Sequence, residues 1–427
     1  MPTVQTAPTV AAPARSVRWR IPVVFGITFF VNYLDRNNLA LALPRIADEF
    51  GWTNQQTGEY GQYLLGAFFL ALGLSNIFLS PLAQRIGPKR SIVLAIAAFS
   101  VVTILQAPLG QYLLILIMLR LLLGIGEGFH VPMMSEITSR WFPRSERSRA
   151  NAIWDVGILL ATALGPVILV PLISSIGWRP TFALLGIVGM VISIPLVLLV
   201  VRDQPRREDG VSEAELAYIS QGSDDIAASA AGKKASTGYL RSGGFWLMTL
   251  AGPLNAFCGF GVLNWLPTYF ERTKGIDFAD LGWPLGIVFS SGVVGVLLMA
   301  VLGDRLNRRA LLMSGGYLVA AVMVFLATNM TALTPLVALF ALGVFFQSAY
   351  TGQEFAVVQR VAPEESIGSA SGVYNGLSIL LGGVGGSLIP GTIVAITGSF
   401  TAGMLSIVVG AVLAAIVLFI LARVIRY

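Results

Sequence analysis

Charged residues are scarce in this sequence, and so are the residue types that build metal sites and disulfide bonds. Only 12% of its 427 residues are charged, against about 25% in an ordinary soluble domain, while 55% are hydrophobic. A soluble protein of this length could not cover its surface with so few charges. The single cysteine, Cys258, excludes an intramolecular disulfide, and the single histidine, His130, argues against a histidine-based metal site. We therefore expect a membrane protein without a metal site.

Long apolar runs stand where charged segments are missing. A membrane-spanning helix needs about 20 mostly apolar residues. The sequence contains twelve such runs, which predict an all-α polytopic membrane protein. Their approximate limits are 21–43, 57–83, 91–108, 112–138, 150–173, 180–201, 244–270, 283–303, 310–328, 335–361, 369–396 and 401–422.

The largest polar interruption lies at residues 202–243 and divides the predicted helices into two sets of six. We predict an N-terminal six-helix bundle over 21–201 and a C-terminal six-helix bundle over 244–422, joined by this linker. Residues 1–20 are expected to form a disordered tail, because most of them are small or polar and proline interrupts them. Residues 423–427 form a second, short tail.

The distribution of basic residues predicts the orientation in the membrane. Of the 28 Lys and Arg residues, 22 fall in connections on one side and 4 on the other. Since Lys and Arg are enriched in cytoplasmic loops, we predict a multi-pass plasma (inner) membrane protein with both termini and the linker in the cytoplasm. The net charge of +6 is then a topology signal and does not indicate nucleic-acid binding. The two remaining basic residues, Arg36 and Arg120, lie within predicted helices.

An internal repeat relates the two halves. The loop sequence QRIGPK at 84–89 corresponds to DRLNRR at 304–309, with an offset of 220 residues. Two bundles repeated in the same orientation are typical of secondary transporters, whose substrate binds between the halves. The same offset relates three pairs of polar residues inside predicted helices: Asp35 with Asn255, Glu127 with Gln347, and Asp155 with Asn375.

These loops and the twelve helices resemble the major facilitator superfamily. The usual pattern Gly-x-x-x-Asp-Arg-x-Gly-Arg-Arg is altered in the first loop, where Gln84 replaces Asp while Arg85 is kept. The second copy keeps Asp304 and Arg305. The resemblance implies that Arg85, Asp304 and Arg305 belong to a conformational gating motif, and we place Asp155, near the end of its helix, in the same group.

Two segments resemble a subgroup of this superfamily more closely. They are Asn-Tyr-Leu-Asp-Arg at 32–36 and the stretch 120–150, which contains Ser-Arg-Trp-Phe-Pro. Both are similar to the anion:cation symporter group, which includes sugar-acid permeases and vesicular glutamate-type carriers. The resemblance implies that matching Tyr, Arg, Asp and Glu positions bind substrate or protons, which adds Tyr33 to the substrate-binding residues.

Ionisable side chains within the predicted helices are few, and each costs at least about 2.5 kcal/mol at the bilayer centre. We interpret Arg36 and Arg120 as binding groups for an anionic substrate, because a guanidinium stays charged and binds a carboxylate bidentately. Asp35 and Glu127 are interpreted as proton carriers. The alternative is that Asp35–Arg36 and Arg120–Glu127 belong to structural ion pairs. Arg120 and Glu127 lie two helical turns apart, so we expect each to meet the first helix or the substrate.

The second half offers further substrate-binding candidates. Gln347, Tyr350 and Glu354 share one face of the tenth predicted helix, although a contact with Arg360 explains Glu354 equally well. Asn375 in the eleventh predicted helix is a candidate hydrogen-bond donor to the substrate.

Four other side chains each allow two interpretations. Trp265 and Tyr269 are candidates for closing the extracellular side over the substrate, while an interfacial aromatic belt explains them nearly as well. For Asp155 we expect a gate or a loop salt bridge with a nearby arginine of 147–149. His130 could adjust the proton affinity of the proton-carrying site. The interpretation we favour is a buried histidine that forms a hydrogen bond with a backbone carbonyl.

The sequence thus predicts a proton-coupled importer of a small organic carboxylate that works by alternating access as a monomer. Sugar acids are the first substrate class and aromatic carboxylates the second. The proton is the expected coupling ion; no cofactor is expected, and no ATP-binding loop is present. The alternatives are an organic anion exchanger and a proton-driven exporter of the same fold. A ligand sensor would need a larger cytoplasmic domain than 202–243, and an enzyme would need a nucleophile–base pair.

Overall fold

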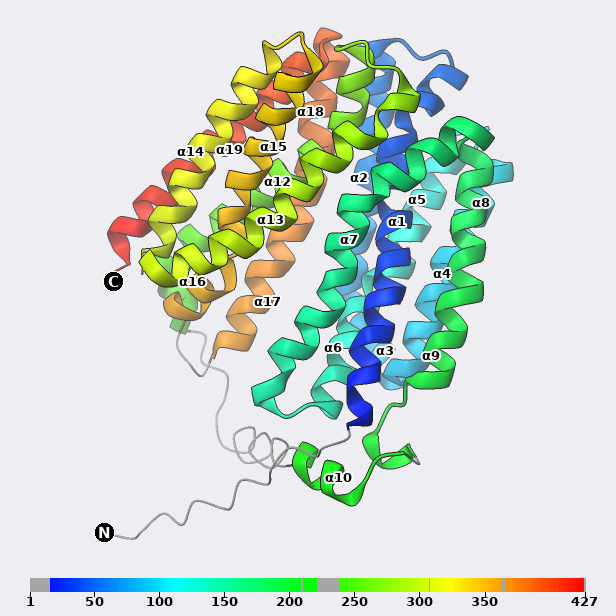
Figure 1. Ribbon diagram of the computed structural model, residues 1–427, viewed down its shortest axis with the longest axis vertical. Coiled ribbons are helices and arrows are strands. Elements are labelled where there is room, and N and C mark those ends of the chain that lie inside the picture. The colour runs from blue at the N-terminus through cyan, green and yellow to red at the C-terminus, as the bar shows by residue number, and fades with distance from the viewer. Residues whose placement is uncertain (1–15, 209, 221–237, 307, 363–365, 426–427) are drawn as a thin grey trace.

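The computed structural model describes residues 16–208, 210–220, 238–306, 308–362 and 366–425. Within these ranges the regular structure is helical and contains no strand. The helices form two bundles that lie side by side, each built from one half of the chain (Figure 1). The predicted all-α fold of two helical bundles is confirmed.

The first bundle consists of six membrane-length segments, three of which are interrupted by a break or by a π-helical turn. In chain order, these segments are α1 (Arg20–Glu49), α2 (Asn54–Phe78) with α3 (Ser80–Ile86), α4 (Pro88–Leu109), α5 (Leu113–Gly128) with α6 (His130–Trp141), α7 (Arg144–Ile176), and α8 (Trp178–Val188) with the π-helical turn η2 (Gly189–Ser193) and α9 (Ile194–Val200).

The second bundle repeats this plan after the linker, which contains η3 (Pro205–Arg207) and α10 (Glu213–Ser220). Short 3-10 helices, η4 (Gly238–Arg241) and η5 (Phe278–Asp280), precede its first two long helices. The six segments are α12 (Gly243–Arg272), α13 (Gly282–Leu306), α14 (Arg309–Thr328), α15 (Leu333–Thr351) with α16 (Glu354–Val361), α17 (Ile367–Leu377) with the π-helical turn η7 (Ser378–Gly383) and α18 (Val384–Thr397), and α19 (Phe400–Val424).

Eleven helical segments of the described residues are long and apolar enough to cross a membrane. The predicted span at 21–43 lies in α1, an unbroken helix of 30 residues. At about 1.5 Å per residue, α1 is about 45 Å long and exceeds the hydrocarbon core of about 30 Å. α1 is not one of the eleven segments, because a polar stretch in its middle makes it less apolar than they are. This stretch contains Asn32, Asp35, Arg36, Asn37 and Asn38.

The fourth membrane segment is broken in both halves, so the repeat extends to the backbone. In the first half, a single residue, Phe129, separates α5 from α6. The Ser75 hydroxyl of α2 donates to the Ile125 carbonyl of α5 at 2.7 Å. In the second half, Gln353 lies between α15 and α16, and its amide donates to the Met299 carbonyl of α13 at 2.7 Å. Each break is therefore held by a side-chain hydrogen bond to a backbone carbonyl.

The two bundles meet along α2–α18, α7–α13 and α1–α12. The α2–α18 contact is close: a Cβ atom on Gly58 would lie 2.6 Å from the backbone nitrogen of Ala395. Farther along the same contact, the Thr392 hydroxyl donates to Gln62 Oε1 at 2.6 Å. Glycine at position 58 is required because any side chain would push the two helices apart.

Four charged residues join the halves at the ends of α1 and α12. Arg45 pairs with Glu271, and Arg272 pairs with Asp48. We call Arg45, Asp48, Glu271 and Arg272 the α1–α12 clamp. The guanidinium carbon of Arg45 also lies 4.6 Å from the centre of the Phe278 ring. Among the described residues, no other ion pair connects the two bundles, so the ion pairs between the halves are confined to this face.

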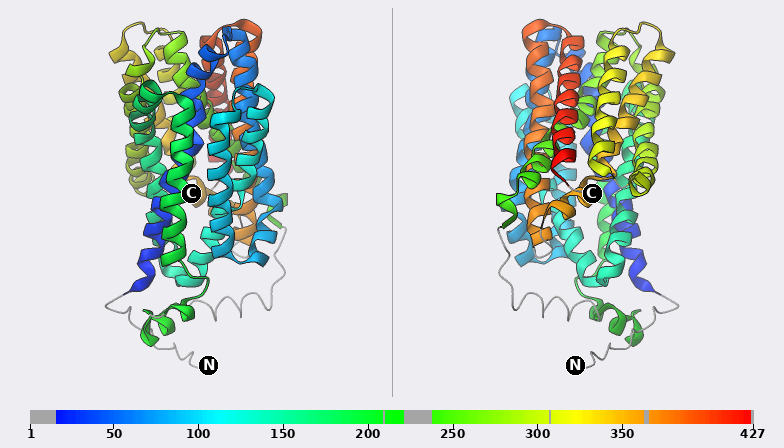
Figure 2. Two further views of the ribbon diagram at one scale, coloured as in Figure 1. Left: turned by 90° about the vertical axis from the view of Figure 1, so that its right-hand side faces the viewer. Right: turned by 90° about the vertical axis from the view of Figure 1, so that its left-hand side faces the viewer.

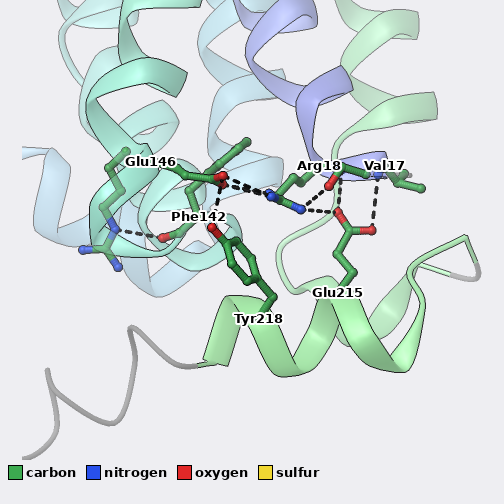
Figure 3. A network of polar contacts seen from close by, with 8 residues as sticks. Val17, Arg18, Phe142, Glu146, Glu215 and Tyr218 are labelled. Carbon is green, nitrogen blue, oxygen red and sulfur yellow. Dashed lines mark hydrogen bonds and ion pairs between the residues drawn. The ribbon is translucent and has the colours of Figure 1, made fainter. Parts of the chain in front are cut away.

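The linker helix α10 docks on the first bundle at the opposite face, which we call the linker face (Figures 1 and 2). Arg18 connects them: its guanidinium lies 3.0 Å from a Glu146 oxygen of α7 and 3.0 Å from a Glu215 oxygen of α10 (Figure 3). The Tyr218 hydroxyl of α10 also donates to Glu146, at 3.3 Å. The linker helix α10 therefore packs with the first half.

This network corrects part of the predicted disordered tail. Residues 1–15 lie outside the described residues, but Val17–Trp19 form a 3-10 helix, η1, that leads directly into α1. The side chain of Arg18 is only 1% exposed. A charge this deeply buried needs partners, and the two carboxylates of Glu146 and Glu215 supply them. The tail is thus ordered from residue 16, because these carboxylates hold it.

Candidate functional site

The central feature of the first bundle is an ion pair between α1 and α5. Arg36 donates to Glu127 Oε2 from Nε at 3.1 Å and from Nη2 at 2.8 Å. Tyr33, one turn earlier on α1, has its ring centre 4.3 Å from the Arg36 guanidinium carbon. The second oxygen of Glu127, Oε1, is buried and has no hydrogen-bond partner among the described residues. Arg36 is therefore held by a carboxylate on one side and an aromatic ring on the other.

The second buried arginine lies behind Phe68 of α2. The Phe68 ring centre is 5.4 Å from the guanidinium carbon of Arg36 and 5.4 Å from that of Arg120. Arg120 is 1% exposed and donates from Nη1 to Asn38 Oδ1 at 3.3 Å, while its Nε finds no partner within the described part of the chain. Both guanidiniums thus concentrate positive charge at one end of the site.

The close contact of α5 with α2 positions these groups. A Cβ atom on Gly124 would lie 2.4 Å from the backbone oxygen of Phe68. Gly124 is one turn from Arg120 and one turn from Glu127, so all three face α2 and α1. As expected, Arg120 and Glu127 contact residues of α1 rather than each other.

Asp35 points away from Arg36 and has uncharged partners. Its Oδ1 accepts from Asn38 Nδ2 at 2.7 Å, and its Oδ2 accepts from the Thr103 hydroxyl of α4 at 2.7 Å. Among the described residues it forms no ion pair. The alternative pairing of Asp35 with Arg36 is therefore not found, and neither is a pairing of Arg120 with Glu127.

His130 is buried without the backbone carbonyl that we expected as its partner. Neither ring nitrogen has a hydrogen-bond partner in the part of the chain that the structure describes. The imidazole instead packs edge-on against Phe29, with ring centres 5.9 Å apart. It is tilted against Phe99, with ring centres 6.3 Å apart. The reason is local: α6 begins at His130, and the side chain turns into the aromatic core of the first bundle.

Two cavities lie between the bundles and share part of their walls. The first, of about 370 Å³, contains Tyr33, Arg36, Glu127 and Asp155 in its wall; we call it the N-cavity. The second, of about 350 Å³, is the C-cavity. Its polar wall residues are Thr162, Asn255, Gln347, Ser348, Thr351, Glu354, Asn375 and Ser378.

The two cavities are neighbours. Asn375 of α17 and Ile379 of η7 belong to both walls. Volumes of this size match ordinary small-molecule sites, which occupy about 300–1,000 Å³. The N-cavity wall also includes Ser135 of α6, Asn151 of α7 and Phe355 of α16.

A chain of hydrogen bonds supports Glu354 in the C-cavity wall. The Tyr374 hydroxyl donates to Glu354 Oε2 at 2.6 Å, and the hydroxyls of Tyr350 and Tyr374 are 2.8 Å apart. Tyr350 is fully buried and does not line a cavity, so its hydroxyl reaches the wall through Tyr374. Asn255 is held similarly, since the Tyr317 hydroxyl donates to its Oδ1 at 2.6 Å.

Trp265 and Tyr269 lie in the interior on the clamp side of the second bundle. The Trp265 indole donates to the Ser387 carbonyl at 3.2 Å, and the ring packs where Gly61 and Gly391 bring α2 and α18 together. Tyr269 packs against Phe340 with ring centres 6.0 Å apart. Neither side chain is in the wall of the N-cavity or the C-cavity.

The loop-motif residues lie on the surface at the linker face. Arg85 and Arg305 are exposed, and Asp304 pairs with Arg309 at 2.6 Å. Asp155 is instead in the N-cavity wall. The arginines expected to pair with it, at positions 147–149, lie in the first turns of α7, and among the described residues no ion pair of Asp155 is found.

Sequence reasoning missed two residues of this site. Phe68 lies in an apolar run of α2, where nothing distinguishes it from residues that face lipid or core. Tyr374 directly precedes Asn375 and orients Glu354, but a tyrosine in a membrane helix carries no signal of its own. No cluster of His, Cys, Asp and Glu suited to a metal ion occurs in the described ranges.

Comparisons with known proteins identify relatives over most of the chain. A model of the Major Facilitator Superfamily matches residues 25–387. The chain is 29% identical over 397 residues to a D-galactonate transporter of Escherichia coli, covering 89% of each protein. It is 26% identical over 427 residues to a probable galactarate/D-glucarate transporter of Bacillus subtilis, covering 95% of this chain and 92% of that protein.

A solved structure shares the fold. A bacterial homologue of the human lysosomal transporter Spinster, in an inward-facing and occupied conformation, superposes with a TM-score of 0.80 at 17% identity. The match covers 97% of this chain and 98% of that one.

Proposed function

Because this chain belongs to the major facilitator superfamily, we propose that it imports a small organic carboxylate together with protons, by alternating access. The named relatives are transporters of sugar acids and not enzymes, which supports a membrane transporter and makes sugar acids the first substrate class. Aromatic carboxylates are the second class. In this proposal the proton is the coupling ion, no cofactor takes part, and the monomer is the functional unit.

The observation that carries the proposal is the Arg36–Glu127 ion pair in the cavity wall. A substrate carboxylate needs the same guanidinium that Glu127 occupies at 2.8 Å. Protonation of Glu127 removes its charge and releases Arg36, which then binds the substrate carboxylate bidentately. Loss of that proton restores the pair and displaces the substrate. Competition for one guanidinium thus couples substrate binding to a proton.

Asp35 is proposed as a second proton carrier. Its carboxyl group is buried and accepts hydrogen bonds from uncharged groups at 2.7 Å, so it has no fixed cation to hold it charged. A buried carboxyl inside the membrane is expensive unless it is paired or takes part in function. Asp35 and Arg36 are adjacent on α1, so a change at one moves the backbone that carries the other.

The direction of access follows from the loop charges and the clamp. The distribution of Lys and Arg in the loops supports a location in the plasma (inner) membrane, with both termini and the linker face on the cytoplasmic side. The α1–α12 clamp then closes the outer side, and the cavities belong to an inward-facing state. Import requires the clamp to open while the linker-face ends of the two bundles come together.

The experiment is uptake of labelled galactonate into proteoliposomes that contain the purified full-length chain. We expect an inward proton gradient to drive accumulation and a protonophore to abolish it. Glu127→Gln should keep galactonate counterflow but lose gradient-driven accumulation. The matched control is Glu59→Gln, which makes the same chemical change at an exposed site outside both cavity walls.

Two results would contradict this proposal. Uptake that requires an internal anion and ignores the proton gradient would indicate an organic anion exchanger instead. Gradient-driven accumulation that survives in Glu127→Gln would remove Glu127 from the coupling mechanism. Competition by benzoate in the same assay separates aromatic acids from sugar acids.

A further inference from the structure

The charges in the walls of the two cavities are unevenly distributed. Among the described residues that line them, Arg36 is the one cation, while three residues carry carboxylates: Glu127, Asp155 and Glu354. Arg120 is outside both walls and lies behind Phe68, at the same end as Arg36. The N-cavity wall therefore carries positive charge, whereas the C-cavity wall has no cation among the described residues.

The other end presents a carboxylate that is held in place. Glu354 lines the C-cavity, and Tyr374 donates to its Oε2 at 2.6 Å. Within the described chain, no ion pair neutralises Glu354, and its Oε1 forms no hydrogen bond. Tyr350 orients Tyr374 from behind, so the carboxylate is fixed by two buried phenols. In its ionised form, this carboxylate accepts hydrogen bonds and repels anions.

Uncharged polar groups lie near this carboxylate in the C-cavity wall. Asn255, Gln347 and Asn375 each carry an amide that both donates and accepts hydrogen bonds. The Asn255 oxygen already accepts from Tyr317, which leaves its NH₂ group for a ligand. Such a wall suits the hydroxyl groups of a polyol chain, and it offers no second cation for another acidic group.

We propose that the cavity selects a hydroxylated monocarboxylate over the dicarboxylate of the same length, with Glu354 as the residue that rejects the second carboxylate. This inference rests on the proposed transport of an organic acid and specifies its charge. A monoanion places its carboxylate at Arg36 and its hydroxyl groups toward Glu354 and the amides. A dianion of equal length places its second carboxylate against like charge, which costs binding free energy.

The test compares galactonate with galactarate, two six-carbon acids that differ in having one carboxylate or two. Dissociation constants are measured at neutral pH on the purified full-length protein. We expect galactonate to bind at least about tenfold more tightly to the wild type. In Glu354→Gln, which keeps an acceptor for Tyr374 but removes the charge, this preference should fall about tenfold. Asp155→Asn provides a second variant at the other unpaired carboxylate, and Glu59→Gln is the control at an exposed site.

A second pair of ligands separates this inference from the proposed function. Hexanoate and adipate also differ by one carboxylate, but they carry no hydroxyl groups. If neither sugar acid binds while hexanoate is still preferred over adipate, the sugar-acid proposal fails and the charge selection stands. The inference is overturned if the wild type binds galactarate as tightly as galactonate, or if Glu354→Gln leaves the ratio unchanged, including the case in which only Asp155→Asn changes it.

Discussion

Arg36 and Glu127, 91 residues apart in the chain, form a hydrogen-bonded ion pair of 2.8 Å in the wall of the cavity between the two bundles. The pair joins α1 to α5, and both side chains are less than 10% exposed. Breaking such a pair by removing one partner leaves an uncompensated buried charge, which typically costs about 3–5 kcal/mol. Protonation of Glu127 together with a substrate anion at Arg36 separates the two residues without leaving either side chain as an uncompensated charge.

The first prediction concerns the geometry of Arg36. Arg36→Lys keeps the charge but loses the planar, bidentate guanidinium and its stacking on Tyr33. We expect galactonate affinity to fall by about tenfold or more, equivalent to about 1.4 kcal/mol. Isothermal titration on the purified protein measures it. Arg20→Lys, at the exposed start of α1, is the control; unchanged affinity in Arg36→Lys would contradict the role of Arg36.

The second prediction concerns helix approach at Gly124. A methyl group there would lie 2.4 Å from the backbone oxygen of Phe68, so Gly124→Ala must displace α5 from α2. Overpacking of this kind costs about 1–3 kcal/mol, and it also moves Arg120 and Glu127. The melting temperature and galactonate affinity should both fall. Gly315→Ala is the matched control, because no heavy atom lies within 4 Å of its added methyl group.

The third prediction concerns Tyr374, which positions Glu354. Tyr374→Phe keeps the ring that packs against Phe355 but removes the hydrogen bonds to Glu354 and Tyr350. We expect the preference for galactonate over galactarate to lie between those of the wild type and Glu354→Gln, because the carboxylate is no longer held at the wall. A purely structural tyrosine would change stability and leave this ratio as it was.

The fourth prediction concerns the α1–α12 clamp. Asp48→Asn combined with Glu271→Gln removes both of its carboxylate partners. Partly exposed ion pairs contribute about 0.2–1 kcal/mol each, so the double variant should populate a state that is open at the clamp face. Electron–electron double resonance between spin labels at Gln55 and Asp280, both exposed, would detect a second and longer distance. A distribution identical to that of the unmutated background would exclude a closing role.

The fifth prediction concerns the docking of α10. Arg18→Ala leaves Glu215 buried without a cation, and it removes the link to Glu146. Loss of one partner of a buried pair costs about 3–5 kcal/mol, so α10 should detach. Hydrogen–deuterium exchange of residues 213–220 should rise sharply, while exchange in α7 beyond its first turns stays low. Arg20→Ala, which removes an exposed neighbouring arginine, should leave exchange in α10 unchanged.

The architecture was predictable because lipid imposes a strong constraint on sequence. Apolar runs of about 20 residues and the repeat offset were sufficient to predict two six-helix bundles. The face of α1 was also predictable, since Tyr33 and Arg36 are one turn apart and both line the N-cavity. Local helical geometry determines these features, and the sequence encodes it directly.

Pairings between helices were not predictable, because they depend on how two helices rotate against each other. Glu127 has Arg36 and not Arg120 as its partner, and no spacing along one helix could distinguish these pairs. From sequence, Arg18 is one of the basic residues that indicate topology. In the structure it is the buried arginine whose ion pairs connect α10 to the first bundle. Its partner Glu215 lies in a linker that composition alone describes as polar.

The α1–α12 clamp and the Arg36–Glu127 ion pair differ in their contact with water. Side chains of the clamp are between 14% and 40% exposed, whereas Glu127 is fully buried beside Arg36. Dissolved salt screens charges that water reaches and affects buried pairs far less. Raising the ionic strength should therefore weaken the clamp and leave the Arg36–Glu127 pair intact. Salt and pH would then act on separate steps of the cycle, one on access to the cavity and the other on its occupation.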